Sequence, residues 1–393
     1  MGRIALAADR TGAPPVRRGA APAPLEIRRL VRPAAEALES LAGEWDALAD
    51  RASEPNPFAE RWFVAASLPA MAGRSEIRII EVRRGNRLIG VLPVSTDRPY
   101  GRIPVAYVQN WCHPHMFLGT PLVEAGEEKA FWAAALAALD EAAWAPNFVH
   151  LRGLVENGPI HLALAAAARD LGRGCPIVHR RVRAFLDSDL GPQAYYERAV
   201  RHKKRKELRR LRNRLAELGP VRCRALADPA DLDAWCDAYL ALEEAGWKGK
   251  AGTALVGDGR TETFFRGVLA AAWAAGRLQF LRLDVGDRPV AMLVNFLTAP
   301  GSFSFKTVFD EDFARFSPGV LIQLENLAIL GRPDVAWMDS CALDDHPMIE
   351  GLWTERRAVV RVTIRLRGAR RAAIFALSRT LELGSAAFRK LFR

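Results

Sequence analysis

Hydrophobic and polar residues alternate in the same way in two distant stretches of the chain. In the first, EIRIIEVRR at 76–84 precedes Gly85-Asn86 and RLIGVLPVS; in the second, RLQFLRLDV at 277–285 precedes Gly286-Asp287 and RPVAMLVNF. Alternation with a period of two residues is typical of strands, and Gly-Asn or Gly-Asp between two such runs favours a tight turn. The pattern therefore predicts a β-hairpin in each half of the chain.

The elements around the two hairpins repeat as well. A third strand is predicted after each hairpin, and two helices with aromatic residues are predicted before it. The third strands are 102–109 and 302–309, and the helices are 33–50 (Trp45), 58–70 (Phe58, Trp62), 229–245 (Trp235) and 261–275 (Phe264, Phe265). A helix and a strand then follow in each half, at 127–143 and 147–151, and at 318–331 and 335–339; helix 158–171 and strand 176–185 close the first half.

Each half is thus predicted to contain two helices, a three-stranded meander, a crossover helix and a further strand. This order indicates an α/β fold with a mixed, α+β-type sheet, built as two tandem units. A chance likeness between two ordinary α/β domains is the alternative. The boundary is expected near 186–192, where Asp, Ser, Gly and Pro interrupt the pattern, and the two hairpins should then lie in separate sheets.

We expect the chain to divide into four parts. Residues 1–24 have Arg scattered among Ala, Gly and Pro, which predicts a disordered leader rather than a secretion signal. Residues 25–187 and 188–365 form the two domains. Residues 366–393 are basic and amphipathic, which predicts a helix that packs on the domain or, alternatively, attaches to an anionic lipid surface.

Residues 198–214 form a basic run, RAVRHKKRKELRRLRNR, with Glu207 as the only acid. Leu208, Leu211 and Leu215 have helical spacing, so a helix with one apolar stripe is predicted. Its other faces are either solvated or bind phosphates, of tRNA or of an anionic membrane. Only Tyr195 and Tyr196 lie close enough to stack on bases, so nucleic-acid binding would be electrostatic and sensitive to salt.

Composition agrees with a soluble globular protein that has an anionic partner. The formal charge is +11 and the pI is about 9.8, although the abundance of Arg and Ala also suggests an influence of genome composition. Five cysteines without a CxxC pair indicate a reducing compartment, and no apolar run reaches membrane-spanning length. Cys112, His113 and His115 resemble a metal cluster only weakly, so a packed loop and no metal are expected.

The segment 303–331, FSFKTVFDEDFARFSPGVLIQLENLAILG, contains a candidate anion site. Ser317-Pro318-Gly319 is a typical helix start, in which Ser caps, Pro fits the first turn and Gly leaves the backbone accessible. The free N–H groups at a helix N-terminus attract anions, and Arg315 could add a charged contact. A simple helix start is the alternative.

The meander, the DEDFARFSPGVL loop and the helix after it resemble the acyl-coenzyme A arm of the GNAT acyltransferases. KKRKELRRLRNRLAELG at 203–219, LEEAGWKGKAGTAL at 242–255 and LDDHPMIEGLWTERR at 343–357 are similar to the CelD-like, BioF-associated branch, which is related to the Fem aminoacyl-transferases. The resemblance covers about residues 25–365 and implies two tandem GNAT-like units. The usual Gln/Arg-x-x-Gly-x-Gly/Ala loop is replaced here by Arg315-Phe316-Ser317-Pro318-Gly319, and the first half has no such arm.

The resemblance implies transfer of an acetyl or other acyl group from coenzyme A to an amine or hydroxyl acceptor, without a metal. It places the coenzyme in the second half, at Arg315, Phe316, Ser317, Pro318, Gly319 and Val320. Candidates for the proton acceptor are Asp339, Asp310 and His346, while Cys341 is a proton donor or a buried structural thiol. Lys306 and a mobile loop with Trp247 and Lys248 are candidates for substrate binding.

Two other functions stay open at this point. An aminoacyl-tRNA-dependent transferase of the Fem type would use the basic helix for tRNA, and a non-enzymatic scaffold would use the C-terminal tail at a membrane. The acceptor is equally open between polysaccharide, cell-envelope precursor, small amine and carrier-bound metabolite. The expected location is the cytoplasm, with the inner face of the membrane as an alternative.

Overall fold

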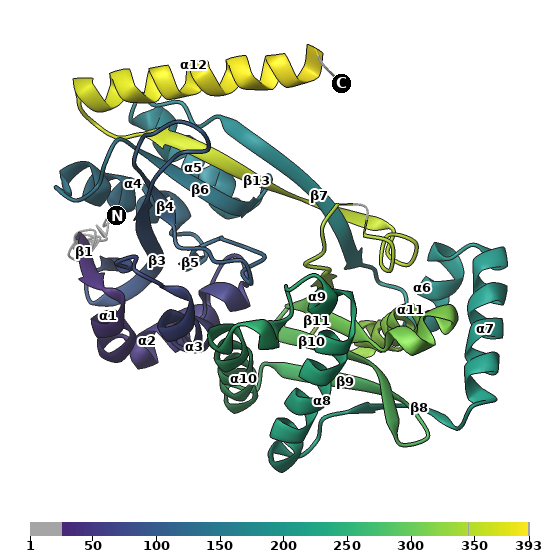
Figure 1. Cartoon of the computed structure of the whole chain (residues 1–393). Coiled ribbons are helices and arrows are strands. Elements are labelled where there is room, and N and C mark those ends of the chain that lie inside the picture. Colours follow the sequence, from purple (N-terminus) through teal and green to yellow (C-terminus); the bar gives the residue numbers. More distant parts are fainter. Residues whose placement is uncertain (1–25, 345, 392–393) are drawn as a thin grey trace, which may run out of the picture.

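The computed structural model describes residues 26–344 and 346–391, so the predicted leader lies outside the described residues. Within this part of the chain the strands form one 13-stranded sheet, in the order β1-β2-β3-β4-β6-β13-β7-β12-β11-β10-β9-β8, with β5 paired to β3. Figure 1 shows two lobes, and the long strands β7 and β13 run from one toward the other. None of the described helices combines the length and the hydrophobicity needed to cross a membrane.

The first half forms most of the upper lobe in Figure 1, where β13 and α12 from the end of the chain also lie. Its strands are β1 (Ile27–Pro33), β2 (Arg78–Arg84), β3 (Arg87–Asp97), β4 (Tyr107–Asn110), β5 (Leu122–Val123), β6 (Phe148–Val155) and β7 (Ile177–Asp187). Its helices are α1 (Ala34–Ser40), α2 (Ala42–Ala49), η1 (Pro57–Ala59), α3 (Arg61–Met71), α4 (Glu128–Glu141) and α5 (Pro159–Asp170). Most agree with the predicted ranges, but the predicted helix 33–50 divides at Leu41.

The second half begins with helices α6 (Pro192–Ala199) and α7 (His202–Ala216). Its strands are β8 (Val221–Ala225), β9 (Leu278–Val285), β10 (Arg288–Thr298), β11 (Gly301–Phe309), β12 (Trp337–Asp339) and β13 (Glu355–Arg365). Its other helices are η2 (Pro229–Asp231), α8 (Leu232–Ala245), α9 (Trp247–Lys250), η3 (Leu255–Gly257), α10 (Gly259–Ala274), η4 (Glu311–Phe316), α11 (Pro318–Glu325), η5 (Asn326–Gly331) and α12 (Ala369–Leu391).

The two halves repeat one topology, as two tandem units. In each, a hairpin turns at the predicted Gly-containing pair: β2 and β3 flank Gly85-Asn86, and β9 and β10 flank Gly286-Asp287. A third antiparallel strand follows, β4 or β11, and a crossover helix, α4 or α11, leads to a parallel neighbour, β6 or β12. The duplication expected from the sequence is therefore present.

The expectation of two separate sheets is wrong, because two strands connect the units. Strand β13 leaves the second half and inserts between β6 and β7 of the first, pairing antiparallel with both. The last residues of β7, Phe185–Asp187, pair in turn with β12 of the second unit. The predicted boundary near 186–192 coincides with the end of β7, but the chain crosses it again at β13. The sequence analysis did not predict β1, β5, β8 or β13 as strands.

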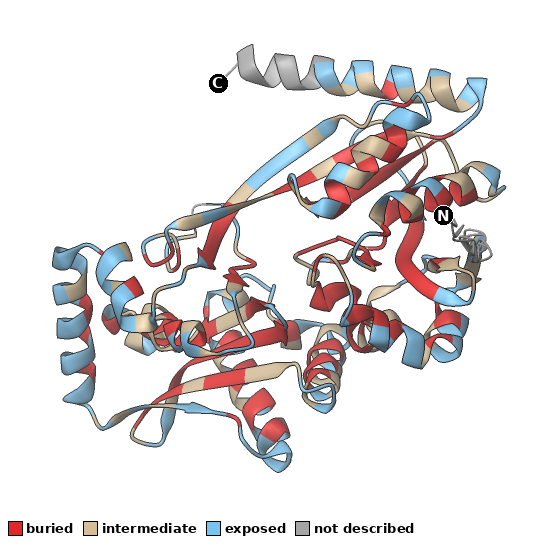
Figure 2. Cartoon of the chain, turned by 180° about the vertical axis from the view of Figure 1, so that it is seen from behind, coloured by how far each residue is buried: buried red, intermediate tan, exposed pale blue. Residues whose placement is uncertain are grey.

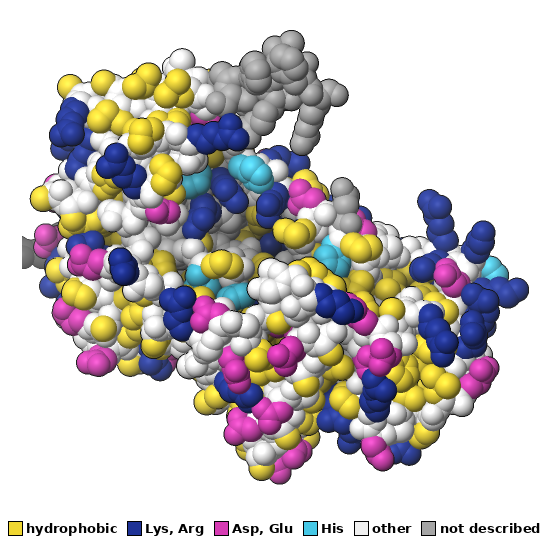
Figure 3. Space-filling model, viewed as in Figure 1, with side chains coloured by type: hydrophobic (Ala, Val, Ile, Leu, Met, Phe, Trp, Pro, Cys, Tyr) yellow, Lys and Arg dark blue, Asp and Glu magenta, His cyan; other side chains and the backbone are white. Residues whose placement is uncertain are grey.

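The basic run is two helices rather than one, because α6 ends at Ala199 and α7 begins at His202. Leu208, Leu211 and Leu215 are buried as the spacing predicted, while the basic side chains project outward from the edge of the molecule (Figure 3). The C-terminal helix predicted within 366–393 is α12.

An aromatic cluster packs the two units together below the shared sheet. Phe58, fully buried, contacts Phe63 and Phe117 of the first unit and Phe303 of the second edge to face, with ring centroids 5.2, 5.8 and 5.7 Å away. Figure 2 shows the buried residues concentrated in the sheet and on the inner faces of the helices. The cluster excludes water from the junction, so the units should not unfold independently.

Replacing Phe58 by Ala should lower the free energy of unfolding by about 3–5 kcal/mol, because the cavity lies in a packed aromatic core. Urea denaturation followed by tryptophan fluorescence and circular dichroism measures this loss. Leu218→Ala, at a side chain that is 54% exposed, is the control and should change stability by no more than about 0.5 kcal/mol. Two separate transitions in the wild-type protein would contradict joint unfolding of the units.

Candidate functional site

An opening in the second unit lies where two parallel strands separate. Strands β11 and β12 pair only at Gly301–Phe303 with Trp337–Asp339. Just beyond, the register of β10 with β11 shifts, because Val294 pairs with Lys306 and Asn295 with Ser304, so Phe305 occupies a β-bulge. Bulges leave backbone groups unpaired and redirect side chains, and are frequent next to active sites.

A cavity of about 320 Å³ fills this opening. It is lined by β11, the end of α8, α9 and the segment after β12; the lining includes Glu243, Trp247, Lys248, Ser304, Phe305, Lys306, Gln323, Cys341, His346 and Met348. The size suits part of a cofactor-sized ligand. Three residues proposed from the sequence for substrate binding, Trp247, Lys248 and Lys306, are therefore brought together.

Lys306 is the most perturbed cation of this cavity. Burial lowers the pKa of its ammonium to about 8, and the nearby charge of Lys248 adds to the effect. Lys306 forms no ion pair with a carboxylate in the part of the chain that the structure describes, and its Nζ lies 5.3 Å from the Phe305 ring centroid. Lys248, by contrast, is paired with Glu243 at 2.6 Å. Lys306 is thus the cation available to a ligand.

Trp247 and Lys248 lie on the short helix α9, not in the mobile loop that the sequence suggested. Glu243 accepts from the Lys248 ammonium and from the Leu255 backbone N–H, so it fixes both ends of this turn. Gly249 has no room for a Cβ, which would lie 1.7 Å from the Glu244 carbonyl oxygen. The indole of Trp247 is 59% exposed and stands at the rim of the cavity.

Asp339 is fully buried at the end of β12, in an ion triad. Its carboxylate contacts Arg183 of β7 at 2.6 Å and Arg357 of β13 at 3.1 Å, and it accepts the backbone N–H of Cys341 at 2.9 Å. Burial alone would raise the pKa of this carboxyl, but the two guanidinium groups outweigh it and hold the pKa below its ordinary value. This carboxylate is therefore a poor proton acceptor and a strong structural tie, contrary to the role considered from the sequence.

Of the other two proton-acceptor candidates, only His346 lines the cavity. Asp310 caps η4 and binds Arg288 at 2.6 Å, away from the opening between the strands. His346 is half-buried, its Nδ1 has no partner among the described residues, and burial with the charge of Lys248 lowers its pKa. A neutral imidazole with an unoccupied nitrogen can accept a proton.

The segment predicted to bind phosphates, 315–320, is only partly accessible. Ser317 joins η4 to α11 in the left-handed conformation, with φ of 54°, and its side chain makes no capping hydrogen bond, contrary to the expected cap. Gly319 is covered by Met348: a Cβ at Gly319 would lie 2.5 Å from the Met348 Sδ. The Arg315 guanidinium lies over the Phe316 ring, at 4.7 Å. Access to the start of α11 therefore depends on the flexible side chain of Met348.

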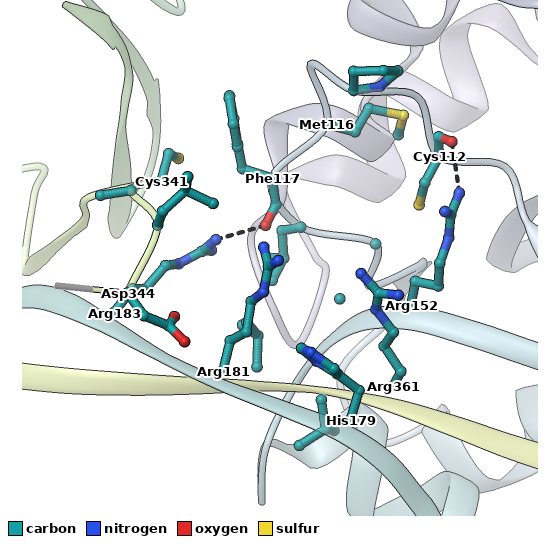
Figure 4. Close-up of a pocket in the computed structure, with 18 of the residues that line it drawn as sticks. Cys112, Met116, Phe117, Arg152, His179, Arg181, Arg183, Cys341, Asp344 and Arg361 are labelled. Carbon is teal, nitrogen blue, oxygen red and sulfur yellow. Dashed lines mark hydrogen bonds between the residues drawn. The ribbon is translucent and has the colours of Figure 1, made fainter. Parts of the chain in front are cut away.

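Cys341, buried in the left-handed conformation with φ of 54°, forms the wall between two cavities. Burial raises the pKa of its thiol, which stays protonated at neutral pH. On the far side lies a second cavity of about 350 Å³, between the units. Figure 4 shows Arg152, Arg181, Arg361 and His179 around it, with Arg183 beside Phe117.

The sequence analysis did not single out these arginines. A signal was present in the predicted strand 176–185, since His179, Arg181 and Arg183 alternate and so share one face. Nothing in the sequence indicated that Arg361 and Arg152 lie beside this face, because β13 was not predicted to return to the first unit. The trio Cys112, His113 and His115 forms a packed loop at this cavity. Among the described residues no group of His, Cys, Asp or Glu is placed to hold a metal.

The equivalent opening of the first unit is filled by the chain itself. Strands β4 and β6 pair only at Val108–Gln109 with Val149–His150. Beyond them, the Asn110 side chain accepts the Arg152 N–H and donates to the carbonyls of Gly119 and Arg152, each at 2.8 Å. Gly119 has no space for a Cβ, which would lie 2.0 Å from the Arg152 carbonyl oxygen. The two units thus share a topology, but in the first the gap directly beyond the paired residues is bridged by Asn110.

Residues 202–344 match the profile of the acetyltransferase (GNAT) domain; this range includes α7, α8, β9–β12 and most residues that line the open cavity, but not His346 and Met348. Among solved structures, FemX is 10% identical, with 85% of this chain and 97% of that one covered and a TM-score of 0.55. A conserved protein of unknown function from Bacteroides thetaiotaomicron is 11% identical, with 84% and 97% covered and a TM-score of 0.54. At this identity both show a shared fold. No curated protein sequence matches the chain.

Asp339→Asn should lower the free energy of unfolding at pH 7 by about 3–5 kcal/mol, because Arg183 and Arg357 lose their shared partner. The folded-state pKa lies below the unfolded value of about 3.9, so the carboxylate stabilises above pH 3.9 and the gain is lost as the pH falls through the folded value. Urea titrations at several pH values test this. Asp334→Asn, in an exposed pair with Arg332, is the control and should cost no more than about 1 kcal/mol.

Lys306→Met should stabilise the protein near pH 7, by about 1–3 kcal/mol, because the buried ammonium is penalised in the folded state. The folded pKa of about 8 lies below the unfolded value of about 10.4, so wild-type stability should rise toward that of the variant between these pH values. Denaturation of both proteins at pH 7 and pH 9.5 measures the difference. Equal stability at both pH values would mean that Lys306 is not desolvated.

Proposed function

We propose that the protein transfers an acyl group from an acyl-coenzyme A donor to an amine or hydroxyl acceptor, and that the donor binds in the cavity between β11 and β12. The observation that carries this proposal is the separation of these two strands at a β-bulge, within the residues that match the GNAT domain. The first unit supports the assignment to the second, since its equivalent opening is closed by Asn110.

The lining of the cavity fits such a donor. The start of α11 offers the backbone N–H of Gly319 for a phosphate, beside Arg315, once Met348 moves from Gly319. Phe309 and Val308 of β11 supply apolar contacts for the arm. A bound acyl-coenzyme A supplies a thioester, and a backbone N–H group at the Phe305 bulge is placed to donate to its carbonyl oxygen as negative charge develops.

The proton of the acceptor goes to His346 in this proposal. His346 lines the cavity with a neutral imidazole, whereas Asp310 and Asp339 are engaged by guanidinium groups. The protonated thiol of Cys341 lines the same cavity and is able to donate to a departing thiolate. Asp339 positions this wall through the Cys341 N–H, so it is a positioning residue rather than a catalytic one.

An aminoacyl-tRNA donor is the second candidate, and the basic outer face of α7 is the observation that favours it. Lys203, Arg209 and Arg210 are exposed there, and no described aromatic side chain interrupts α7. Such a surface binds phosphates without reading sequence. All five cysteines are free, which supports a reducing compartment, and we place the reaction in the cytoplasm.

Acetyl-coenzyme A should raise the melting temperature of the wild-type protein. Deacylated tRNA should raise it only at low salt concentration. Gly319→Val should weaken acetyl-coenzyme A binding at least about tenfold, since the new side chain pushes Met348 into the path of the phosphates. Titration calorimetry measures the affinity. Gly331→Val is the matched control, because a Cβ at Gly331 meets nothing within 4 Å.

Combining Gly319→Val with Met348→Ala should restore part of the affinity, because the smaller side chain frees the space. If Gly319→Val stays folded and binds acetyl-coenzyme A normally, the phosphate position is wrong. If the wild-type protein shows no binding of acetyl-coenzyme A and binds tRNA at physiological salt, the donor is the aminoacyl-tRNA and the first proposal fails.

A further inference from the structure

The cavity between the two units is lined by more positively charged side chains than there are carboxylates to neutralise them. Arg152 comes from β6, Arg181 from β7 and Arg361 from β13, and Figure 4 shows the three side chains converging on one space. Among the described residues, Asp344 is the one acidic residue of the lining, and it makes none of the ion pairs found there. The cavity therefore presents several guanidinium groups and little compensating charge.

Other arginines of the same strands are compensated. Arg180 of β7 binds Glu156 at 2.7 Å, and Arg183 and Arg357 share Asp339. Arg181 and Arg361, in contrast, make no hydrogen bond or ion pair with a described side chain. The lack of a charged partner is therefore a property of the arginines that line the cavity, not of all arginines on these strands.

Arg152 has an unsatisfied donor in the same place. Its Nη2 donates to the Cys112 carbonyl at 2.8 Å, which fixes the side chain, but its buried Nε has no partner among the described residues. Burial lowers the pKa of Arg361, and the neighbouring charges of Arg152 and Arg181 lower it further. Clustered guanidinium groups with an unsatisfied buried donor are unfavourable unless an anion is bound between them.

The position of this cluster relates it to the donor cavity. Phe117, Cys341, Ala342 and Leu343 line both cavities, so the two spaces meet at the Cys341 wall. Arg152, His179 and Arg361 also line a third cavity of about 710 Å³, which extends beneath α12 to Tyr100 and Tyr107. In Figure 3 the corresponding face is hollowed between the lobes, with basic and histidine side chains at its walls.

We infer that the acceptor of the proposed reaction is an anionic molecule, whose phosphate or carboxylate group binds between Arg152, Arg181 and Arg361. The inference rests on the proposed function for the identity of the donor, but the anion site itself stands on the cavity. Held there, the acceptor directs one end toward Cys341 and the donor, while the rest extends into the space beneath α12. Guanidinium groups recognise both kinds of anion through paired N–H donors.

The test is a titration of the full-length protein with inorganic phosphate, pyrophosphate and succinate at constant ionic strength. Saturating coenzyme A is present in one series, so that the phosphate positions of the donor are already occupied. We expect the melting temperature to rise with at least one anion, and its affinity to fall at least about tenfold in Arg361→Gln and in Arg152→Gln. Stronger binding of phosphate or pyrophosphate indicates a phosphorylated acceptor, and stronger binding of succinate a carboxylic acid.

Arg180→Gln is the matched control, since it removes the same charge from the neighbouring strand β7 at a residue that does not line the cavity. It should leave anion affinity unchanged. Without added anion, Arg361→Gln should be as stable as the wild-type protein or more stable, because it removes repulsion. An equal loss of affinity in Arg180→Gln would show an effect of net charge and overturn the inference.

The two proposals fail in different ways. If coenzyme A binds but no anion binding depends on Arg361 or Arg152, the anionic acceptor is wrong and the acyltransferase proposal stands. If coenzyme A does not bind but anion binding depends on both arginines, the anion site stands and the donor assignment fails.

Discussion

The buried carboxylate of Asp339 and the two guanidinium groups around it connect the parts of this molecule. Asp339 lies on β12, Arg183 on β7 and Arg357 on β13, so the triad joins three strands at the place where the two units meet. Arg183 also donates to the Phe117 carbonyl and Asp339 accepts from the Cys341 N–H, so the triad fixes both walls that the two cavities share. A buried charge of this kind is tolerated only with its partners in place, which makes the geometry of the junction strict.

The two tandem units show how one topology serves two purposes. In both, a parallel pair of strands follows a meander and separates after a few residues. In the second unit the β-bulge at Phe305 lies next to the point where β11 and β12 stop pairing, and the gap between these strands stays open. In the first, the Asn110 amide satisfies the backbone groups of the separating strands, and Gly119 lets the following loop pack against them. A single polar side chain thus bridges, in the first unit, the gap that stays open in the second.

The positive charge of the chain is distributed in two ways. Most arginines of the described sheet lie beside carboxylates, as Arg224 lies beside Asp284 and Arg84 beside Glu127. Uncompensated charge gathers in two places, on the solvent face of α7 and inside the cavity between the units. The first is spread over an exposed helix face and is screened by salt, whereas the second converges on one cavity, where Arg152 and Arg361 are partly buried.

The local pattern of hydrophobic, polar and turn-forming residues determined the elements that form between residues close together in the sequence. The hairpins at Gly85-Asn86 and Gly286-Asp287, the leucine stripe of α7 and the order of elements in both units follow from periodicity and turn residues. The cavity residues Trp247, Lys248 and Lys306 were found from the resemblance of their segments to a known family. These features need no knowledge of how distant segments pair.

The tertiary structure decided those features that depend on the pairing of strands far apart in the sequence. The return of β13 between β6 and β7 joins the units into one sheet, and the sequence of β13 is typical of any half-buried strand. Because of that return, Arg361 meets Arg152 and Arg181, and Asp339 acquires two guanidinium partners instead of a catalytic role. Strand partners are selected by packing across the whole chain, so neither the arginine cluster nor the triad could be predicted from local sequence.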